Sequence, residues 1–141
     1  MARHSRELTL GAIAQCKPGA PFRVIGEFCD AFAQLHNYRI PEPICGHGIG
    51  RFFHQPPVLR HTVEGGDDEV QGQAMEPGMV FTVEPCILET VEKSVGGDLD
   101  GELAYAEDEW AILSTDGSWS AAHEETILIT QNGCEILTST E

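Results

Sequence analysis

A glycine-rich segment with two histidines, residues 45–54 (CGHGIGRFFH), constrains the fold of this chain more than any other feature. It places His47 and His54 seven residues apart, with glycines on both sides of His47. Glycine has no Cβ atom, so it allows turns and close approach of neighbouring backbone that a side chain would hinder. We therefore predict strand and turn here, with His47 exposed to a cleft.

A carboxylate closes the next strand-like segment. Residues 79–83 are a β-rich apolar run that follows Pro77 and Gly78, and Glu84 comes directly after the run. An unpaired charge at the end of a largely buried strand costs several kcal/mol. A metal ion or a polar partner is therefore the economical explanation of Glu84.

Two adjacent glutamates lie in a third segment, residues 120–126 (SAAHEET). Side chains alternate along a strand, so only one of Glu124 and Glu125 can point into a site. Histidine nitrogen and carboxylate oxygen are the ligands of hydrolytic centres that use divalent metals. A lone histidine or strand-end glutamate is more often structural or solvated. The ordered combination of the three segments instead favours a metal site.

Two helices precede these segments. Apolar residues recur at helical spacing, which predicts a short helix over residues 6–16 and a longer one from Phe22 to near Asn37. Residues 61–73 contain two adjacent glycines and several acids without periodicity, so we interpret them as a surface loop that opens at His61.

The second half of the chain is predicted to be mostly strand. Residues 94–109 are rich in glycine and acidic residues and are interpreted as an exposed insertion. Residues 109–113 and 120–130 are predicted to form an antiparallel pair around the turn at 115–118. A final strand is expected over residues 134–137, after the turn-forming Asn132 and Gly133.

The composition limits the classes of protein that this chain can belong to. It has 141 residues, 41% of them hydrophobic, which is enough for one domain with an ordinary core. The formal net charge is −15, from 23 acidic and 8 basic side chains. This charge argues against a nucleic-acid or anionic-membrane surface, where Lys and Arg would cluster. The acidic excess serves either solubility or a basic partner.

The cysteines indicate in which kind of cellular compartment the protein works. Five are scattered without a Cys-x-x-Cys pair, which suits a reducing environment. No run of about 18 apolar residues exists for a membrane span, and no secretory signal opens the chain. We expect a cytoplasmic protein, or an organellar one if a targeting segment lies upstream.

The three segments, in this order, resemble the carboxyl-terminal half of the type I methionine aminopeptidases, from about Leu8 to Thr138. The resemblance implies an α+β fold, half of the pita-bread (creatinase/aminopeptidase-like) fold, with a curved antiparallel sheet covered on one face by two helices. It also implies that residues 1–141 form one partial catalytic domain without the amino-terminal half, which carries two further aspartate ligands.

The resemblance implies metal-dependent removal of the amino-terminal methionine from nascent proteins. His47 and Glu84 would bind one metal and Glu124 would bridge it to a second, while Glu84 would also move a proton. The complete family site holds two ions of cobalt, manganese, iron or zinc. Without the aspartates, we expect at most one weakly held ion here.

Three residues are expected at the substrate by the same resemblance: His54 hydrogen-bonds it, and Phe53 and Trp110 line the methionine pocket. For both aromatic residues, packing in the core is the alternative.

Two alternatives remain to the interpretation that this chain is by itself a complete enzyme. One is an inactive homologue that acts as a protein-binding module. The other is an enzyme completed by a separate amino-terminal half.

Overall fold

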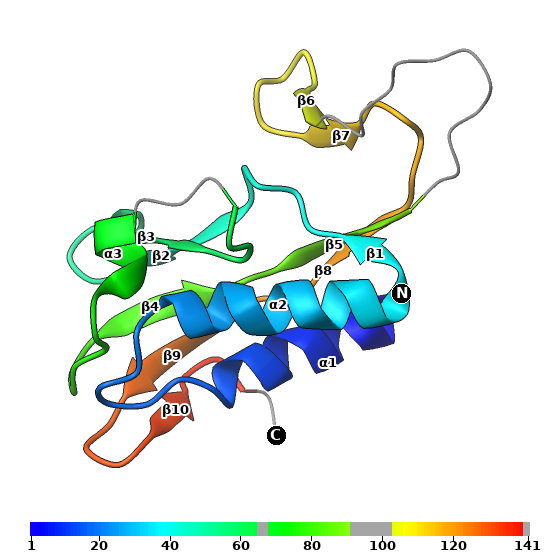
Figure 1. Cartoon of the computed structure of the whole chain (residues 1–141). Helices are drawn as coiled ribbons and strands as arrows, with labels where there is room; N and C mark the ends of the chain where they lie inside the picture. Colours follow the sequence, from blue (N-terminus) through cyan, green and yellow to red (C-terminus); the bar gives the residue numbers. More distant parts are fainter. Residues whose placement is uncertain (65–67, 91–102, 140–141) are drawn as a thin grey trace.

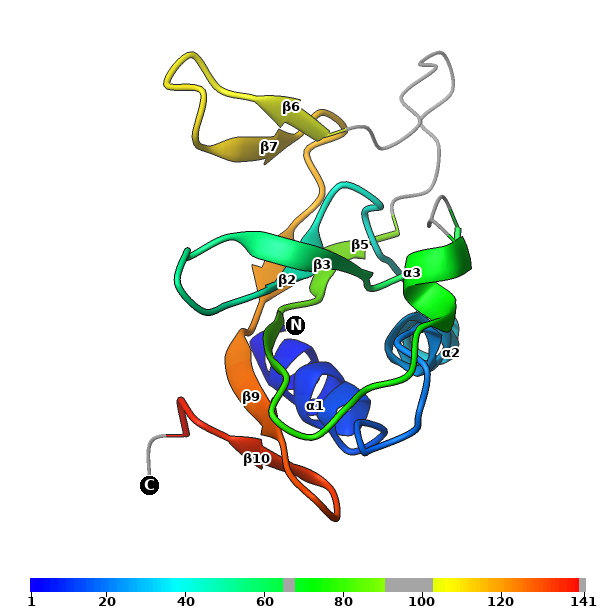
Figure 2. The same ribbon diagram turned by 90° about the vertical axis from the view of Figure 1, so that its left-hand side faces the viewer.

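Two long helices pack side by side on one face of curved antiparallel sheet (Figures 1 and 2). The structure is a computed structural model that describes residues 1–64, 68–90 and 103–139. The helices are α1 (Ala2–Ile13), α2 (Arg23–His36) and the short α3 (Asp68–Gly72). This arrangement is the α+β architecture that the sequence predicts.

The strands form three sheets. A five-stranded sheet has the order β10 (Cys134–Ile136), β9 (Glu125–Ile129), β4 (Val80–Val83), β2 (Cys45–Gly48) and β3 (Gln55–Arg60). A three-stranded sheet has the order β1 (Tyr38–Arg39), β5 (Cys86–Glu89) and β8 (Ser120–Ala122). The strands β6 (Leu103–Tyr105) and β7 (Ile112–Ser114) form a hairpin of their own. All recorded pairings are antiparallel.

The first two sheets are joined through two long strands, each with one interruption. β4 continues into β5 after Glu84 and Pro85, and β8 continues into β9 after His123 and Glu124. The pairs on either side, Val83 with Glu125 and Cys86 with Ala122, belong to one register. The two interruptions therefore lie opposite each other. Proline cannot donate a ladder hydrogen bond, which explains why the pairing stops at Pro85.

Helix α2 closely follows the prediction. Its buried residues recur at three-to-four spacing. The residue after its last turn is Asn37, which has a left-handed backbone (φ 57°) and donates its N–H to the carbonyl oxygens of Ala33 and Gln34. Helix α1 begins at Ala2 and ends at Ile13, earlier than the predicted 6–16. His4 lies in the first turn of this helix, and its Nδ1 contacts the Tyr38 hydroxyl at 3.0 Å.

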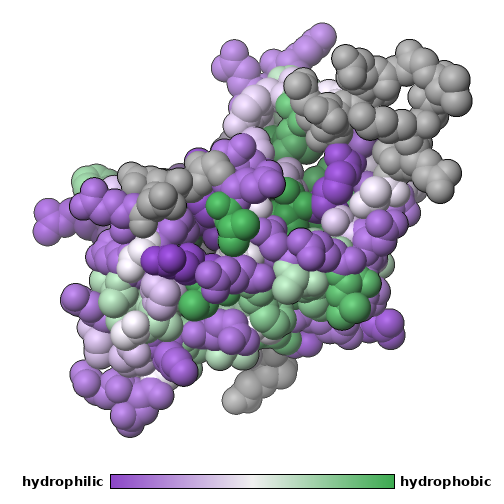
Figure 3. All heavy atoms as spheres, viewed as in Figure 1, coloured by the Kyte–Doolittle hydropathy of each residue, from purple (hydrophilic) through white to green (hydrophobic). Residues whose placement is uncertain are grey.

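The core lies between the two helices and the five-stranded sheet. Helices α1 and α2, with Phe22 just before α2, contribute one set of apolar side chains, and strands β3, β4 and β9 contribute the other. The core includes Leu8, Ala12, Phe22, Ile25, Cys29, Leu59, Phe81, Val83, Ile127 and Ile129. The outer surface over the helices is largely hydrophilic with scattered apolar patches (Figure 3). Among the described residues, no helix is long and apolar enough to cross a membrane.

The sequence interpretation of the strands needs correction at two places. The predicted pair of 109–113 with 120–130 is wrong, because β7 pairs with β6 whereas β8 and β9 pair with β5 and β4. No strand was predicted over β3, which contains Pro56 and Pro57; it lies at the edge of its sheet, where proline is tolerated.

The predicted loop at residues 61–73 includes helix α3, and residues 65–67 lie outside the described part. His61, which was expected to open that loop, is instead 1% exposed. Of the predicted insertion at 94–109, residues 94–102 are outside the described part and β6 occupies Leu103–Tyr105. The final strand β10 confirms the prediction for residues 134–137.

Candidate metal centre

Strand β2 presents His47 to strand β4, and Gly46 allows the two strands to approach. A Cβ atom on Gly46 would lie 2.3 Å from the carbonyl oxygen of Thr82, so any side chain there would force the strands apart. The His47 backbone N–H donates to the Thr82 hydroxyl at 3.0 Å. The glycine recognised in the sequence therefore fixes the spacing at which His47 meets the next strand.

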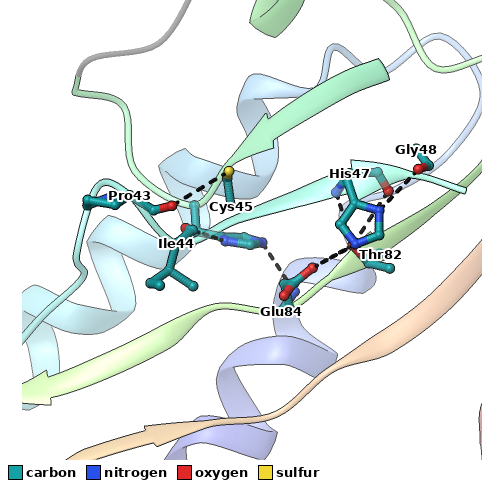
Figure 4. A network of polar contacts seen from close by, with 8 residues as sticks. Pro43, Ile44, Cys45, His47, Gly48, Thr82 and Glu84 are labelled. Atoms are coloured by element: carbon teal, nitrogen blue, oxygen red, sulfur yellow. Dashed lines mark hydrogen bonds and ion pairs between the residues drawn. The ribbon is translucent and has the colours of Figure 1, made fainter. Parts of the chain in front are cut away.

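The imidazole of His47 faces the carboxylate of Glu84 (Figure 4). His47 Nε2 lies 3.6 Å from Glu84 Oε1, and His47 Nδ1 lies 3.1 Å from the carbonyl oxygen of Gly48. A carbonyl oxygen only accepts, so Nδ1 carries the hydrogen of this contact. In the neutral ring, Nε2 then presents a lone pair to Glu84. Two electron-pair donors that face each other are suited to share a cation.

A second carboxylate lies opposite the first. Continuing the register of the pairs Val83 with Glu125 and Cys86 with Ala122 through the two interruptions aligns Glu84 with Glu124. Like charges directly opposite each other on neighbouring strands are destabilising. The arrangement therefore concentrates negative charge at the interruption, beside His47.

The pKa of the Glu84 carboxyl reflects these surroundings. Burial raises its pKa, a hydrogen bond of 2.7 Å from the Thr82 hydroxyl opposes that effect, and the Glu124 carboxylate raises it further. The imidazoles of His47 and His54 act in the opposite direction. Glu84 is thus electrostatically coupled to each of the other polar residues expected in the site.

The turn between β2 and β3 brings His54 and Phe53 to the same place. The ring of His54 lies 4.4 Å from that of His47 in an edge-to-face arrangement, and Phe53 lies 4.6 Å from His54 and 5.7 Å from His47. Phe53 is 66% exposed, so core packing is the wrong explanation for it. Four residues from two sequence segments thus gather at the end of strand β4: His47, Phe53, His54 and Glu84.

Trp110 lies apart from this group. It is in the turn between β6 and β7, a hairpin that projects from the rest of the molecule (Figures 1 and 2). The turn is held by Asp108, whose Oδ1 accepts from the backbone N–H groups of Trp110 and Ala111. Trp110 is 82% exposed, so core packing is wrong for this residue too.

The neighbours of Glu124 form a separate contact. Glu125 is buried and accepts from the Thr138 hydroxyl, and its Oε1 lies 3.1 Å from His123 Nε2. These partners connect the end of β10 to the start of β9. Glu125 is therefore occupied away from the pair formed by His47 and Glu84.

The residues present fit a divalent metal in their chemistry. A neutral imidazole nitrogen and carboxylate oxygens are ligands of hard or borderline divalent ions. Across residues 1–64, 68–90 and 103–139, no three side chains of His, Cys, Asp or Glu converge closely enough to hold an ion. Two donors thus face each other, and a third carboxylate is aligned with them by register.

Two polar residues of the site were missed by the sequence interpretation. Thr82, 1% exposed, contacts both His47 and Glu84. His61, also 1% exposed, follows β3, and its Nε2 accepts from the backbone N–H of Glu84 at 3.2 Å. Burial lowers the pKa of His61 to about 4. The spacing of two between Leu59 and His61 is the inward alternation of a strand, and could have identified His61 had β3 been predicted.

Solved structures share this fold. The methionine aminopeptidase from Rickettsia prowazekii superposes with a TM-score of 0.82 and 31% identity, over 97% of this chain and 50% of that one. The prolidase from Pyrococcus furiosus superposes with a TM-score of 0.64 at 22% identity, over 99% of this chain and 32% of that one, which shows the fold alone. The architecture is therefore half of the pita-bread fold of metal-dependent peptidases.

Sequence comparison gives the family. Residues 2–131 match metallopeptidase family M24, and the chain belongs to that family. It is 36% identical to the methionine aminopeptidase of Salmonella typhimurium over 98% of this chain and 47% of that protein. It is 37% identical to methionine aminopeptidase 1 of Saccharomyces cerevisiae, over 96% of this chain and 32% of that protein. The chain spans about half the length of the bacterial relatives named in these comparisons.

Proposed function

We propose that this chain carries part of the active site of a methionyl metalloaminopeptidase, which removes the amino-terminal methionine from nascent proteins. The observation that carries the proposal is the alignment of Glu84 with Glu124 at the two strand interruptions, beside the Nε2 atom of His47. The family and the named relatives support the same reaction.

We assign the metal ligands as His47, Glu84 and Glu124. The donor set accepts cobalt, manganese, iron or zinc, since availability rather than ligand type separates these ions at such a site. With these three ligands we expect this chain to hold at most one ion, and weakly, and two ions require further ligands. A bound divalent ion would polarise the substrate carbonyl and ease deprotonation of water.

The remaining roles belong to side chains around the pair. Glu84 would accept the proton of the attacking water and return it to the leaving amine. His54, with its ring 4.4 Å from that of His47, would donate a hydrogen bond to the oxygen of the scissile carbonyl. Phe53 would contact the methionine side chain, since exposed aromatic rings bind a thioether favourably. The pocket role of Trp110 rests on the resemblance, and a raised KM in Trp110→Ala would be its measure.

We further propose that residues 1–141 are one partial catalytic domain that works with an amino-terminal half, in the same or a separate polypeptide. The coverage of about half of the bacterial relatives supports this. All five cysteines are free, which suits the cytoplasm.

Release of methionine from a methionyl tripeptide, with and without added Co²⁺, tests the function. Combined with its amino-terminal half, the wild-type chain is expected to release methionine only with the metal, and Glu84→Gln should lower the rate by roughly 100-fold or more, because a positioned proton acceptor is lost. Trp119→Ala, at a residue 77% exposed, is the matched control and should retain the rate. Absence of release by the wild-type chain combined with its amino-terminal half, or equal release by Glu84→Gln, would contradict the proposal and favour a protein-binding module.

A further inference from the structure

We propose that His61 is a positioning residue that holds the main chain of Glu84 in place for metal binding. This inference rests on the proposed function, because it takes Glu84 to be a metal ligand. His61 itself would bind neither the metal nor the substrate.

Both ring nitrogens of His61 are engaged by backbone groups. Nδ1 donates to the carbonyl oxygen of Ile44 at 3.1 Å, and Nε2 accepts from the N–H of Glu84 at 3.2 Å. A carbonyl can only accept and an amide N–H can only donate, so this ring is the neutral form with hydrogen on Nδ1. With both nitrogens used, no lone pair is left to bind a metal.

The ring connects the beginning of β2 to the end of β4. Ile44 directly precedes β2, and Glu84 directly follows β4 (Figure 4). Farther along, at the end of β2, the two strands pair through Gly48 and Phe81. From that pair toward Glu84, the Thr82 hydroxyl receives the His47 N–H, and the His61 ring receives the Glu84 N–H. Two side chains thus take the places that backbone carbonyls fill in an ordinary ladder.

This replacement gives the main chain of Glu84 a partner where the ladder between β2 and β4 stops. A continuous ladder would instead leave its N–H with a backbone partner. At Glu84 the ladder is interrupted before Pro85, and a buried N–H without an acceptor is costly. His61 supplies that acceptor, and Thr82 fixes the carboxylate of the same residue through its 2.7 Å hydrogen bond to Oε1. Glu84 is therefore held at both its main chain and its side chain.

The position of His61 supports a passive role. Its side chain is 1% exposed, and its two ring nitrogens already contact the backbone of Ile44 and Glu84. Some residues orient a metal ligand by hydrogen-bonding to it without touching the metal. Their replacement typically changes metal affinity by roughly 10–100-fold. A change of that size is expected here.

Two substitutions separate positioning from packing. In His61→Gln, Oε1 can take the place of Nε2 and accept from the Glu84 N–H. In His61→Asn, the side-chain amide can take the place of Nδ1 and donate to Ile44, but it leaves the Glu84 N–H without an acceptor. The visible absorption of Co²⁺ titrated into each protein reports both the affinity and the ligand geometry.

We expect His61→Asn to bind Co²⁺ roughly 10–100-fold more weakly than the wild-type chain, with an altered spectrum. We expect His61→Gln to remain close to the wild type. Equal weakening in both variants, or wild-type affinity in His61→Asn, would overturn the inference while leaving the metal site in place. Absence of Co²⁺ binding by the wild-type chain would overturn the metal site and this inference together.

A measurement on the wild-type protein covers the case in which both variants fail to fold. Nitrogen NMR of the histidine rings distinguishes hydrogen on Nδ1 from hydrogen on Nε2. His61 is expected to be the Nδ1–H form at neutral pH. Hydrogen on Nε2 would exclude acceptance from the Glu84 N–H and contradict the proposal.

Discussion

The central strands and the β6–β7 hairpin use the same kind of backbone pairing but differ in what surrounds it. Strands β2, β4 and β9 lie beneath α1 and α2, and their inward residues, such as Phe81 and Ile127, are almost fully buried. The hairpin has its own ladder and leaves large apolar side chains in solvent: Tyr105, Trp110, Ile112 and Leu113. The candidate site lies in the first region, where a ligand can be held by neighbours on several sides. The side chains of the hairpin are mostly exposed, so they have fewer neighbours that could hold a ligand in place.

The largest effect that separates the two regions should come from one substitution made in each. Leu59→Ala removes a fully buried side chain of β3, and a cavity of that kind costs about 2–5 kcal/mol of unfolding free energy. Leu113→Ala, at a residue 55% exposed in β7, should change stability by about 0.5 kcal/mol or less. Urea unfolding followed by circular dichroism gives both values. Equal losses would show that the hairpin is as closely packed as the sheet.

A smaller effect is expected from a methyl group placed between β2 and β4. In Gly46→Ala the new Cβ would meet the Thr82 carbonyl oxygen, and overpacking of this kind costs about 1–3 kcal/mol. Gly133→Ala is the matched control, because no atom lies within 4 Å of the Cβ position there. Thermal unfolding of the two variants measures the difference. If Gly46→Ala proved as stable as Gly133→Ala, the close approach at His47 would be refuted.

The smallest effect concerns the connection between the regions. Asp116 lies between β7 and β8 and pairs with Arg39 of β1. Hydrogen bonds from Ser118 and the Arg39 guanidinium lower the pKa of Asp116. A lowered folded-state pKa gives stability that is present above the usual value of the carboxyl, near 3.8, and that is lost as the pH falls through the folded-state pKa.

Urea unfolding between pH 2 and pH 7 measures this contribution. The wild-type chain should lose more stability below about pH 4 than Asp116→Asn, which carries no titrating group at that position. Parallel curves for the two proteins would mean that the ion pair does not secure the connection.

Sequence patterns predicted the parts of the fold that local periodicity specifies. The spacing of apolar residues placed α2 almost to the residue, and the β-rich run after Pro77 and Gly78 gave β4. The partner of β7 could not be obtained this way, because pairing depends on which strands the whole fold brings together. Residues 109–113 have a plausible neighbour on either side in the sequence, and the structure pairs β7 with the earlier one.

The residues of the candidate site divide in the same way, into those that short sequence motifs specify and those that depend on the whole fold. His47, His54, Phe53 and Glu84 were predicted from motifs and lie together, since two short segments carry all four. Trp110 depends on how the hairpin is placed, and it lies apart from them. His61 was missed because its role comes from two backbone groups, of Ile44 and Glu84, that are distant from it in the sequence.

The central claim, that Glu84 and Glu124 face each other to hold a cation, is tested most directly by thermal unfolding of Glu124→Gln with and without Co²⁺. Without metal, removal of one of two opposed charges should stabilise the protein by about 0.2–1 kcal/mol. With metal, the wild-type Tm should rise with Co²⁺ concentration, because binding favours the folded state, and the variant should lose that rise. A Glu124→Gln protein that is less stable without metal, or that keeps the wild-type response to Co²⁺, would contradict the account.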